Sequence, residues 1–258
     1  MAQNLRFGFG DNWKRYLSSL TENKVEAAKQ SLVSLFDGAT FSGNTFLDVG
    51  SGSGLFSLAA RQLGASVRSF DYDLSSVECA EALKSQYFPE SSDWVISQGS
   101  VLDQSFLSEL KKSDFVYSWG VLHHTGEMWQ ALDNVAGLVK PSGLLCVSIY
   151  NDQGWISSYW KTVKRVYNLG PAFAFLMLAS HFPYYFARLT KRVLSGQFKL
   201  ERGMDLWTDY VDWIGGYPFE VATPKEIGSF FEKRGFTLVK SHLRGRRHGC
   251  NEFLFQLV

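Results

Sequence analysis

The chain has 258 residues, of which 45% are hydrophobic and 20% charged, a balance that excludes a disordered chain and suits one large α/β domain or one domain with a substantial insertion. With a formal net charge of +1, the chain lacks the broad positive electrostatic field expected of a nucleic-acid-binding enzyme. Three widely spaced cysteines, without a C-x-x-C pair or a His cluster, predict neither a disulfide nor a structural zinc, and an N-terminus without an apolar segment predicts a cytoplasmic protein.

The first expected helix covers residues 22–36, because apolar side chains recur there at helical spacing. The stretch before it, residues 7–16, is dense in aromatic residues and glycines and includes Trp13 and Tyr16. Such a composition is unusual for a free tail. We therefore treat residues 1–37 as one N-terminal segment that includes the helix.

An apolar strand, a carboxylate and three alternate glycines follow in residues 44–54. Asp48 lies near the carboxyl end of the strand, where it can meet the ammonium group of an amino-acid moiety. Gly50, Gly52 and Gly54 allow a tight turn and a close approach of the backbone to a ligand, and a helix over residues 55–63 offers N–H groups to a carboxylate. This order suits S-adenosylmethionine. An acid here would face the pyrophosphate of NAD, which disfavours a dinucleotide, and a turn without a ligand is the other alternative.

A second expected strand, residues 65–71, ends in another acid. Asp71 lies 17 residues beyond Gly54, close to the ~20-residue offset at which an acid binds ribose hydroxyls. Asp73 is an alternative for that role, or the N-cap of a helix that begins near Leu74. We prefer Asp71, which places the neighbouring Tyr72 beside the adenine.

On these motifs the chain resembles the class I S-adenosylmethionine-dependent methyltransferases over about residues 44–150, and again weakly at the C-terminus. The resemblance implies a Rossmann-like, seven-stranded, mostly parallel sheet with an antiparallel C-terminal hairpin. It also implies that Ser100 and the Val101 backbone contact the adenine, with Asp103 as a helper, although the family usually has an acid where this chain has Ser100. The fourth expected strand begins at Asp114, in a segment over residues 114–125 that is similar to the family's DxVxxxxVLHH segment. Trp119 in this segment completes the expected cofactor site.

Two adjacent histidines follow that strand, at the edge of the sheet where ligands bind in such folds. In a gapless comparison with phosphoethanolamine-type methyltransferases, His124 occupies the position of their catalytic histidine, and Tyr16 lies in the region of their lid tyrosine. The resemblance thus implies that His124, backed by His123, is a general base. The alternative is a histidine that donates to a backbone carbonyl and shapes the loop. No acid cluster follows the strand, so a metal is not indicated.

Many small-molecule methyltransferases fold an N-terminal helix over the cofactor. The resemblance thus implies that residues 1–37 form an N-terminal lid and helix. Trp13 and Tyr16 suit that lid, because an aromatic face attracts a sulfonium cation. The alternative is that these aromatics hold the N-terminus to the core.

Residues 152–222 are too long for an ordinary connection between strands and are rich in aromatic residues, so we expect a helical cap inserted into a domain made of residues 38–151 and 223–258. The apolar run 166–189 is broken at Gly170–Pro171 and at His181–Pro183, which leaves stretches too short to span a membrane. A buried helical hairpin or a lipid-facing cap is the expected structure. Two more features face the substrate in this interpretation: the loop 212–220, and the basic loop 243–251.

The sequence therefore predicts a metal-independent methyltransferase that acts on an O or N atom of a small molecule, with lipid-like and phosphate- or carboxylate-bearing acceptors included. No nucleic acid and no membrane span are expected among its partners, whereas peripheral lipid contact is allowed. One alternative is an RNA methyltransferase that uses Arg244, Arg246 and Arg247. The other is a catalytically inactive cofactor-binding subunit.

Overall fold

The computed structural model describes residues 7–8, 20–194, 206–245 and 248–258. In chain order the described elements are α2 (Glu22–Leu35), β1 (Thr45–Val49), α3 (Leu55–Gln62), β2 (Ser66–Asp71), α4 (Leu74–Tyr87), β3 (Trp94–Gln98), α5 (Gln104–Ser108), β4 (Ser113–Trp119), the 3-10 turn η1 (Leu122–His124), α6 (Met128–Ala136), β5 (Val139–Tyr150), α7 (Trp155–Tyr167), α8 (Pro171–Leu194), α9 (Leu206–Gly215), α10 (Pro224–Glu232), β6 (Phe236–His242) and β7 (Cys250–Leu257). Trp13, Tyr16, Arg246 and Arg247 lie outside the described residues.

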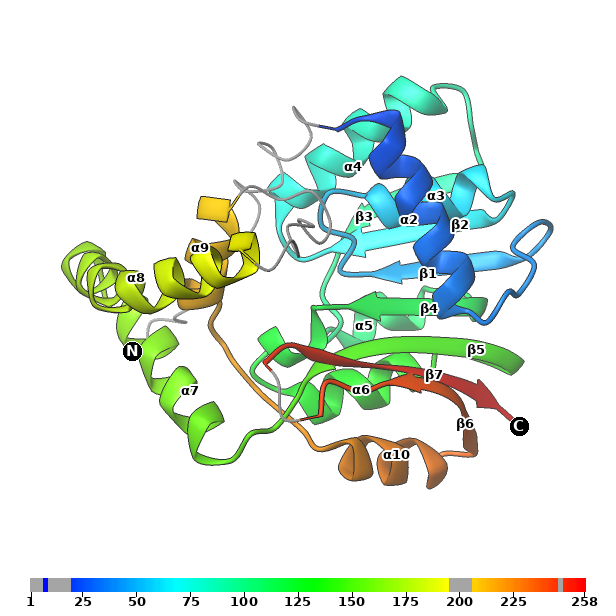
Figure 1. Ribbon diagram of the computed structural model, residues 1–258. Coiled ribbons are helices and arrows are strands. Elements are labelled where there is room, and N and C mark those ends of the chain that lie inside the picture. Colours follow the sequence, from blue (N-terminus) through cyan, green and yellow to red (C-terminus); the bar gives the residue numbers. More distant parts are fainter. Residues whose placement is uncertain (1–6, 9–19, 195–205, 246–247) are drawn as a thin grey trace.

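The seven strands form one sheet in the order β3-β2-β1-β4-β5-β7-β6 (Figure 1). The first five strands are parallel, and β7 is antiparallel to both β5 and β6. The predicted Rossmann-like sheet with its antiparallel C-terminal hairpin is confirmed. The reversal of chain order around β1 and β4 opens a crevice at the carboxyl ends of these strands, as such switch points do.

Successive side chains of each strand point to opposite faces of the sheet, and apolar side chains form a core on each face. Phe46, Phe115 and Tyr117 point to the face covered by α2 and α3, where they are buried among aromatic and aliphatic side chains. Leu47 and Val116 point to the other face, which α6 and α10 cover. Because both faces are covered, most buried positions of these strands are apolar. The buried Ser69 of β2 is an exception, and its hydroxyl accepts a hydrogen bond from the Trp94 indole N–H over 3.0 Å.

The chain between β5 and α10 forms a cap of three helices, α7, α8 and α9, which lies beyond the carboxyl ends of the parallel strands (Figure 1). Its own small core contains Trp160, Val163, Tyr210, Ile214 and Phe219. The helix α10 that follows begins with a capping box in which Thr223 and Glu226 each bind the other's backbone N–H. No helix of the described chain is long and apolar enough to cross a membrane.

One expectation about the cap was wrong. The helix break at Gly170–Pro171 is present, but α8 continues through Pro183 as a single helix of 24 residues instead of ending at His181. Proline removes one intrahelical hydrogen bond at that point. The contacts that the Tyr185 ring and the Leu178 carbonyl make with Tyr210 hold α8 on both sides of the proline.

Candidate active site

A cavity of about 1250 Å³ opens at the carboxyl ends of the parallel strands, between the sheet and the cap. It brings together most of the predicted site. The predicted cofactor residues that line it are Asp48, Gly50, Gly52, Asp71, Tyr72, Ser100, Val101 and Trp119. His124 lines it as well, whereas Gly54 and His123 do not.

The turn between β1 and α3 has the predicted conformation, since Gly50, Gly52 and Gly54 all have positive φ angles. A Cβ on Gly50 would lie 2.4 Å from the Val121 side chain, so the first glycine lets the turn approach the loop that carries the histidines. The third glycine has a different purpose. A Cβ on Gly54 would lie 2.8 Å from the Cα of Ala80, so Gly54 allows α3 to approach α4 closely.

We therefore expect Gly54→Ala to destabilise the protein by ~2–3 kcal/mol, from the strained φ of +79° and the contact with the Ala80 backbone together. Gly38→Ala is a matched control, because Gly38 has nearly the same φ, +78°, but open space around its Cα. Chemical denaturation measures both variants. Equal losses of unfolding free energy would show that the contact with α4 contributes nothing.

Asp71 is held in place by two backbone donors. The N–H of Gly52 donates to its Oδ2 and the N–H of Asp73 to its Oδ1, each over 2.9 Å. The carboxylate is thereby fixed at the cavity wall beside the glycine turn. Asp73 also lines the cavity, and its own side chain accepts from Ser75 N over 2.9 Å and caps α4.

Asp48 is 2% exposed and accepts a hydrogen bond of 2.6 Å from the Ser57 hydroxyl. Burial raises the pKa of Asp48 to about 7, against the opposing effect of the Ser57 hydrogen bond, and the negative charge of Asp71 adds to the rise. A cation placed between these two acids would restore the ionised form of Asp48. The pair is thus suited to a positively charged ligand group.

The segment after β3 forms the next part of the wall. Ser100 and Val101 line the cavity, and the Val101 carbonyl is already bound by the Asn134 side chain over 2.7 Å. Asp103 does not line the cavity but caps α5 by accepting from the N–H groups of Ser105 and Phe106.

The two histidines of η1 have different surroundings. The Nδ1 of His124 lies 2.6 Å from the Pro218 carbonyl oxygen, which can only accept, so Nδ1 carries the proton and the lone pair is on Nε2. His123 is fully buried against Tyr150, with 4.1 Å between the ring centroids, and neither of its nitrogens has a hydrogen-bond partner of good geometry. Burial lowers the pKa of His123 well below its ordinary value, although the nearby Ser148 backbone slightly favours the charged form. A neutral, enclosed His123 is a poor candidate for chemistry in the cavity.

The sequence matches the model of a family described as a methyltransferase domain over residues 21–241. The chain belongs to this methyltransferase family. No match to a curated protein was found. The recognition as a class I methyltransferase, and S-adenosylmethionine as the cofactor, are confirmed by the family match together with the fold.

Solved structures of similar fold have low sequence identity to this methyltransferase. A magnesium protoporphyrin IX methyltransferase from Synechocystis PCC 6803 with bound S-adenosylhomocysteine has a TM-score of 0.57 and 16% identity, over 96% of this chain and 94% of that one. An S-adenosylmethionine-dependent methyltransferase from Aquifex aeolicus has a TM-score of 0.55 and 13% identity, over 98% and 100% of the two chains. An O-methyltransferase family protein from Burkholderia thailandensis has the same TM-score and identity, over 90% and 56%. At these identities the likeness establishes the fold.

The methyltransferase cavity fits S-adenosylmethionine on its own geometry. Gly50 and Gly52 have no side chains to cover the backbone of the turn at the cavity wall. Asp71 is held beside the turn by its hydrogen bond from the Gly52 N–H. Asp48 lies next to the turn as an acid for the ammonium group, and Tyr72 offers a 57% exposed ring for the adenine. No group of three or more His, Cys, Asp and Glu residues in the described chain could hold a metal ion.

Several residues in and around the site cannot be recognised from the sequence because their partners are distant in the chain. Glu252 lines the cavity from β7 and accepts a 2.8 Å hydrogen bond from the indole N–H of Trp119, which is 133 residues away. Asn151 and Asn251 hold the end of β5 to the loop that contains Gly245. Nothing local in the sequence indicates either pairing.

The loop 216–222 docks on the histidines. Glu220 donates its N–H to the His123 carbonyl over 3.0 Å, and its side chain accepts from the Met128 N–H over 3.1 Å. Together with the Pro218 carbonyl on His124, these bonds tie the cap to η1. No residue of this loop lines the cavity, whereas Asp212 and Trp213, which we expected in a loop over residues 212–220, lie on α9 and do line it.

Lys164 is a further buried titratable group, and no pattern in the sequence indicates its burial. Its ammonium donates to the Trp213 carbonyl and lies 4.8 Å and 5.0 Å from the ring centroids of Trp213 and Phe219. Burial lowers the pKa of Lys164 to about 7, although Asp212 and Cys250 favour the charged form. The lysine lies behind the cavity wall and holds α7 to α9.

Proposed function

We propose that this methyltransferase transfers the methyl group of S-adenosylmethionine, without a metal ion, to an O or N atom of a small molecule, including lipid-like and phosphate- or carboxylate-bearing acceptors. The observation that carries the proposal is a single cavity with the glycine turn and Asp71 on one wall and His124 on another. The bound cofactor supplies a methyl group on a sulfonium, which is already activated for displacement. The chain's task is then to hold the acceptor in line, which contributes ~7–11 kcal/mol to lowering the barrier.

The residues divide this task between them. Asp71, fixed by Gly52 and Asp73, accepts hydrogen bonds from hydroxyl groups, and Asp48 pairs with an ammonium group. His124 presents Nε2 as a base because its Nδ1 proton is bound to the Pro218 carbonyl. It accepts the proton of an O–H or N–H acceptor as the methyl group arrives.

The position of Arg244 also favours a small-molecule acceptor over a nucleic-acid acceptor. Arg244 lines the cavity, but its Nε donates to the Cys250 carbonyl and its backbone N–H to Asn251, so it belongs to the inner wall. There it can bind an anionic group of the acceptor. A guanidinium turned inward does not extend a basic surface for a polynucleotide.

Binding of S-adenosylhomocysteine, and not of NAD, is the first test. Calorimetry should give saturable binding of the former, and Asp71→Ala should weaken it at least tenfold, since hydrogen bonds to a charged group contribute ~1.5–3 kcal/mol each. Asp103→Ala is the matched control, an acid after the next strand that caps a helix outside the cavity. Tight NAD binding without a response to S-adenosylhomocysteine would overturn the proposal. An unchanged affinity of the Asp71 variant would transfer the ribose role to Asp73.

A further inference from the structure

The outer side of α8 is an apolar surface that no other described element covers. Its inner side packs on the cap, where Tyr185 lies 4.4 Å from Tyr210 between ring centroids and His181 is bonded to the Tyr159 hydroxyl. The exposed large side chains of α8 are Phe173, Phe175, Leu176, Phe182, Tyr184, Phe186 and Leu194. Phe182 lies at the edge of this surface, because its ring also contacts that of Tyr210 on α9, with 6.3 Å between the centroids. We call these seven residues the α8 face. Phe175 is 73% exposed and Phe186 59%.

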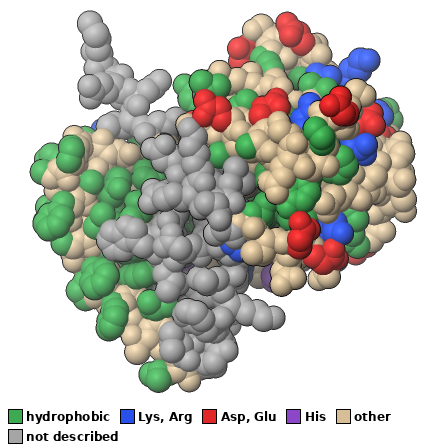
Figure 2. Space-filling view, turned by 90° about the horizontal axis from the view of Figure 1, so that it is seen from above, with side chains coloured by type: hydrophobic (Ala, Val, Ile, Leu, Met, Phe, Trp, Pro, Cys, Tyr) green, Lys and Arg blue, Asp and Glu red, His purple; other side chains and the backbone are tan. Residues whose placement is uncertain are grey.

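This exposure is unusual in its extent and in its chemistry. Scattered exposed apolar residues are normal on a protein surface, but a contiguous set on one helix marks an interaction site. Figure 2 shows hydrophobic side chains gathered over the cap, in contrast to the mixture of acidic and basic side chains over the sheet domain. Between Arg165 and Arg188 the sequence contains no Asp, Glu, Lys or Arg.

The charges that flank the α8 face have one sign. Residues 153–194, which contain α7 and α8, hold six of the 26 Lys and Arg residues and none of the 25 Asp and Glu residues. The segment therefore has a formal charge of +6, and the rest of the chain has −5 within the total of +1. The exposed Lys161, Arg165 and Lys191 border the apolar stretch at its two ends.

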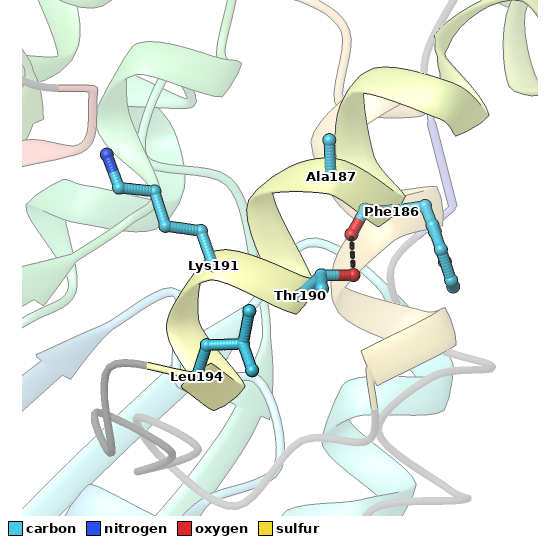
Figure 3. A pocket seen from close by; sticks show the side chains of 5 residues that line it. All are labelled: Phe186, Ala187, Thr190, Lys191 and Leu194. Atoms are coloured by element: carbon cyan, nitrogen blue, oxygen red, sulfur yellow. Dashed lines mark hydrogen bonds between the residues drawn. The ribbon is translucent and has the colours of Figure 1, made fainter.

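The last turns of α8 show the two kinds of side chain together (Figure 3). Phe186, Ala187, Thr190, Lys191 and Leu194 line a shallow open hollow, and the Thr190 hydroxyl donates to the Phe186 carbonyl over 2.9 Å. Lys191 extends away from Phe186 in this view, so the cation stands beside the apolar side chains and does not cover them. Apolar side chains bordered by cations are typical of helices that lie in the headgroup region of anionic membranes.

We propose that the α8 face docks this methyltransferase on the surface of an anionic lipid bilayer. The aromatic side chains enter the boundary between headgroups and acyl chains, and the flanking Lys and Arg residues meet lipid phosphates. An anionic bilayer fits better than a second copy of the chain, because two copies joined through this face would bring two segments of charge +6 together. The proposal rests on the surface alone and does not depend on the acceptor of the methyl group.

Flotation of the full chain with vesicles tests the proposal. We expect binding to vesicles of phosphatidylcholine with 30% phosphatidylserine, weak binding to phosphatidylcholine alone, and a decrease when the salt concentration is raised. Phe175→Ser/Phe186→Ser should reduce binding at least tenfold. The matched control is Leu238→Ser/Val239→Ser, which changes two exposed apolar residues of β6, away from the cap (Figure 1).

A second pair of variants tests the electrostatic part. Lys191→Glu should reduce binding to the anionic vesicles several-fold, whereas Lys225→Glu, an equal charge reversal on α10, should not. Absence of binding to either vesicle, or equal binding by both Phe and control variants, would overturn the proposal. So would sedimentation that shows a dimer dissociated by Phe175→Ser/Phe186→Ser, because the face would then be a protein interface. Affinity for S-adenosylhomocysteine should be unchanged in every variant, which separates this test from that of the proposed function.

Discussion

Replacing His124 by alanine is expected to lower the turnover number by ~10²–10⁴ and to leave the affinity for S-adenosylhomocysteine nearly unchanged. The reason is the position of the imidazole. Its Nδ1 proton is bound to the Pro218 carbonyl, so Nε2 is the basic nitrogen of a ring that lines the cavity. Steady-state kinetics with an identified acceptor, together with calorimetry, measures both quantities.

Two matched variants separate a base from a structural histidine. His124→Asn keeps an N–H group that can donate to the Pro218 carbonyl but removes the base, so it should retain stability and still lose turnover. His123→Leu removes a buried ring whose nitrogens have no good partner, so it should keep turnover and lose little stability.

A turnover number in His124→Asn equal to that of wild type would mean that the histidine only positions the loop. A rate that is unchanged in His124→Ala across the pH range would mean that catalysis is proximity alone. The acceptor would then be a free amine or a thiolate, which needs no base before transfer.

The parts of the fold that the sequence predicts are those determined by neighbours in the chain. The strand before Asp48, the glycine turn and the strand before Asp71 each carry their own short-range pattern, and their order is sufficient to place them at one edge of a parallel sheet. The class, the sheet and the cofactor follow from this order. The sequence also identifies His124 as a residue of the cavity wall.

The rest depends on contacts between distant segments. The hydrogen bond of Trp119 to Glu252 and the docking of residues 216–222 on the histidines join parts of the chain that have no pattern in common. The role of Gly54 is visible only when α4 is in place, because the Cα of Ala80 is what excludes a side chain there. Pro183 misled the prediction for the same reason, since tertiary contacts with Tyr210 maintain a helix that local propensity disfavours.

Asp48 and Lys164 should make the stability of the ligand-free protein depend on pH in opposite directions. The folded pKa of Asp48 is raised to about 7, so the unfolded chain loses this proton first, and the unfolding free energy falls as pH rises from about 4 to 7. The folded pKa of Lys164 is lowered to about 7, so the unfolded chain keeps its proton longer, and the unfolding free energy rises as pH increases from about 7 to 10.5. Each change is on the order of 4 kcal/mol.

Subtracting the unfolding free energy of wild type from that of a variant at each pH isolates the contribution of the mutated group. Titrations shared by both proteins, including that of the buried His123, then cancel. Asp48→Asn keeps an acceptor for the Ser57 hydroxyl, so its unfolding free energy relative to wild type should rise by up to ~4 kcal/mol between pH 4 and 8 and stay constant above. Lys164→Met should differ from wild type by a constant amount below pH 7, and its relative stability should fall above that pH. Urea denaturation at a series of pH values measures both curves. If the difference in unfolding free energy between each variant and wild type did not change with pH, neither group would titrate abnormally.

The same titration of Asp48 should appear in cofactor binding. Only the ionised carboxylate pairs with an ammonium group, so S-adenosylhomocysteine should bind more tightly as pH rises through about 7, and its binding should draw a proton off the protein below that pH. Calorimetry in two buffers of different ionisation enthalpy measures the released proton. Asp48→Asn should bind more weakly at pH 8 and release none. Binding of equal strength and without proton release in both proteins would remove Asp48 from the cofactor site and leave Asp71 as its anchoring acid.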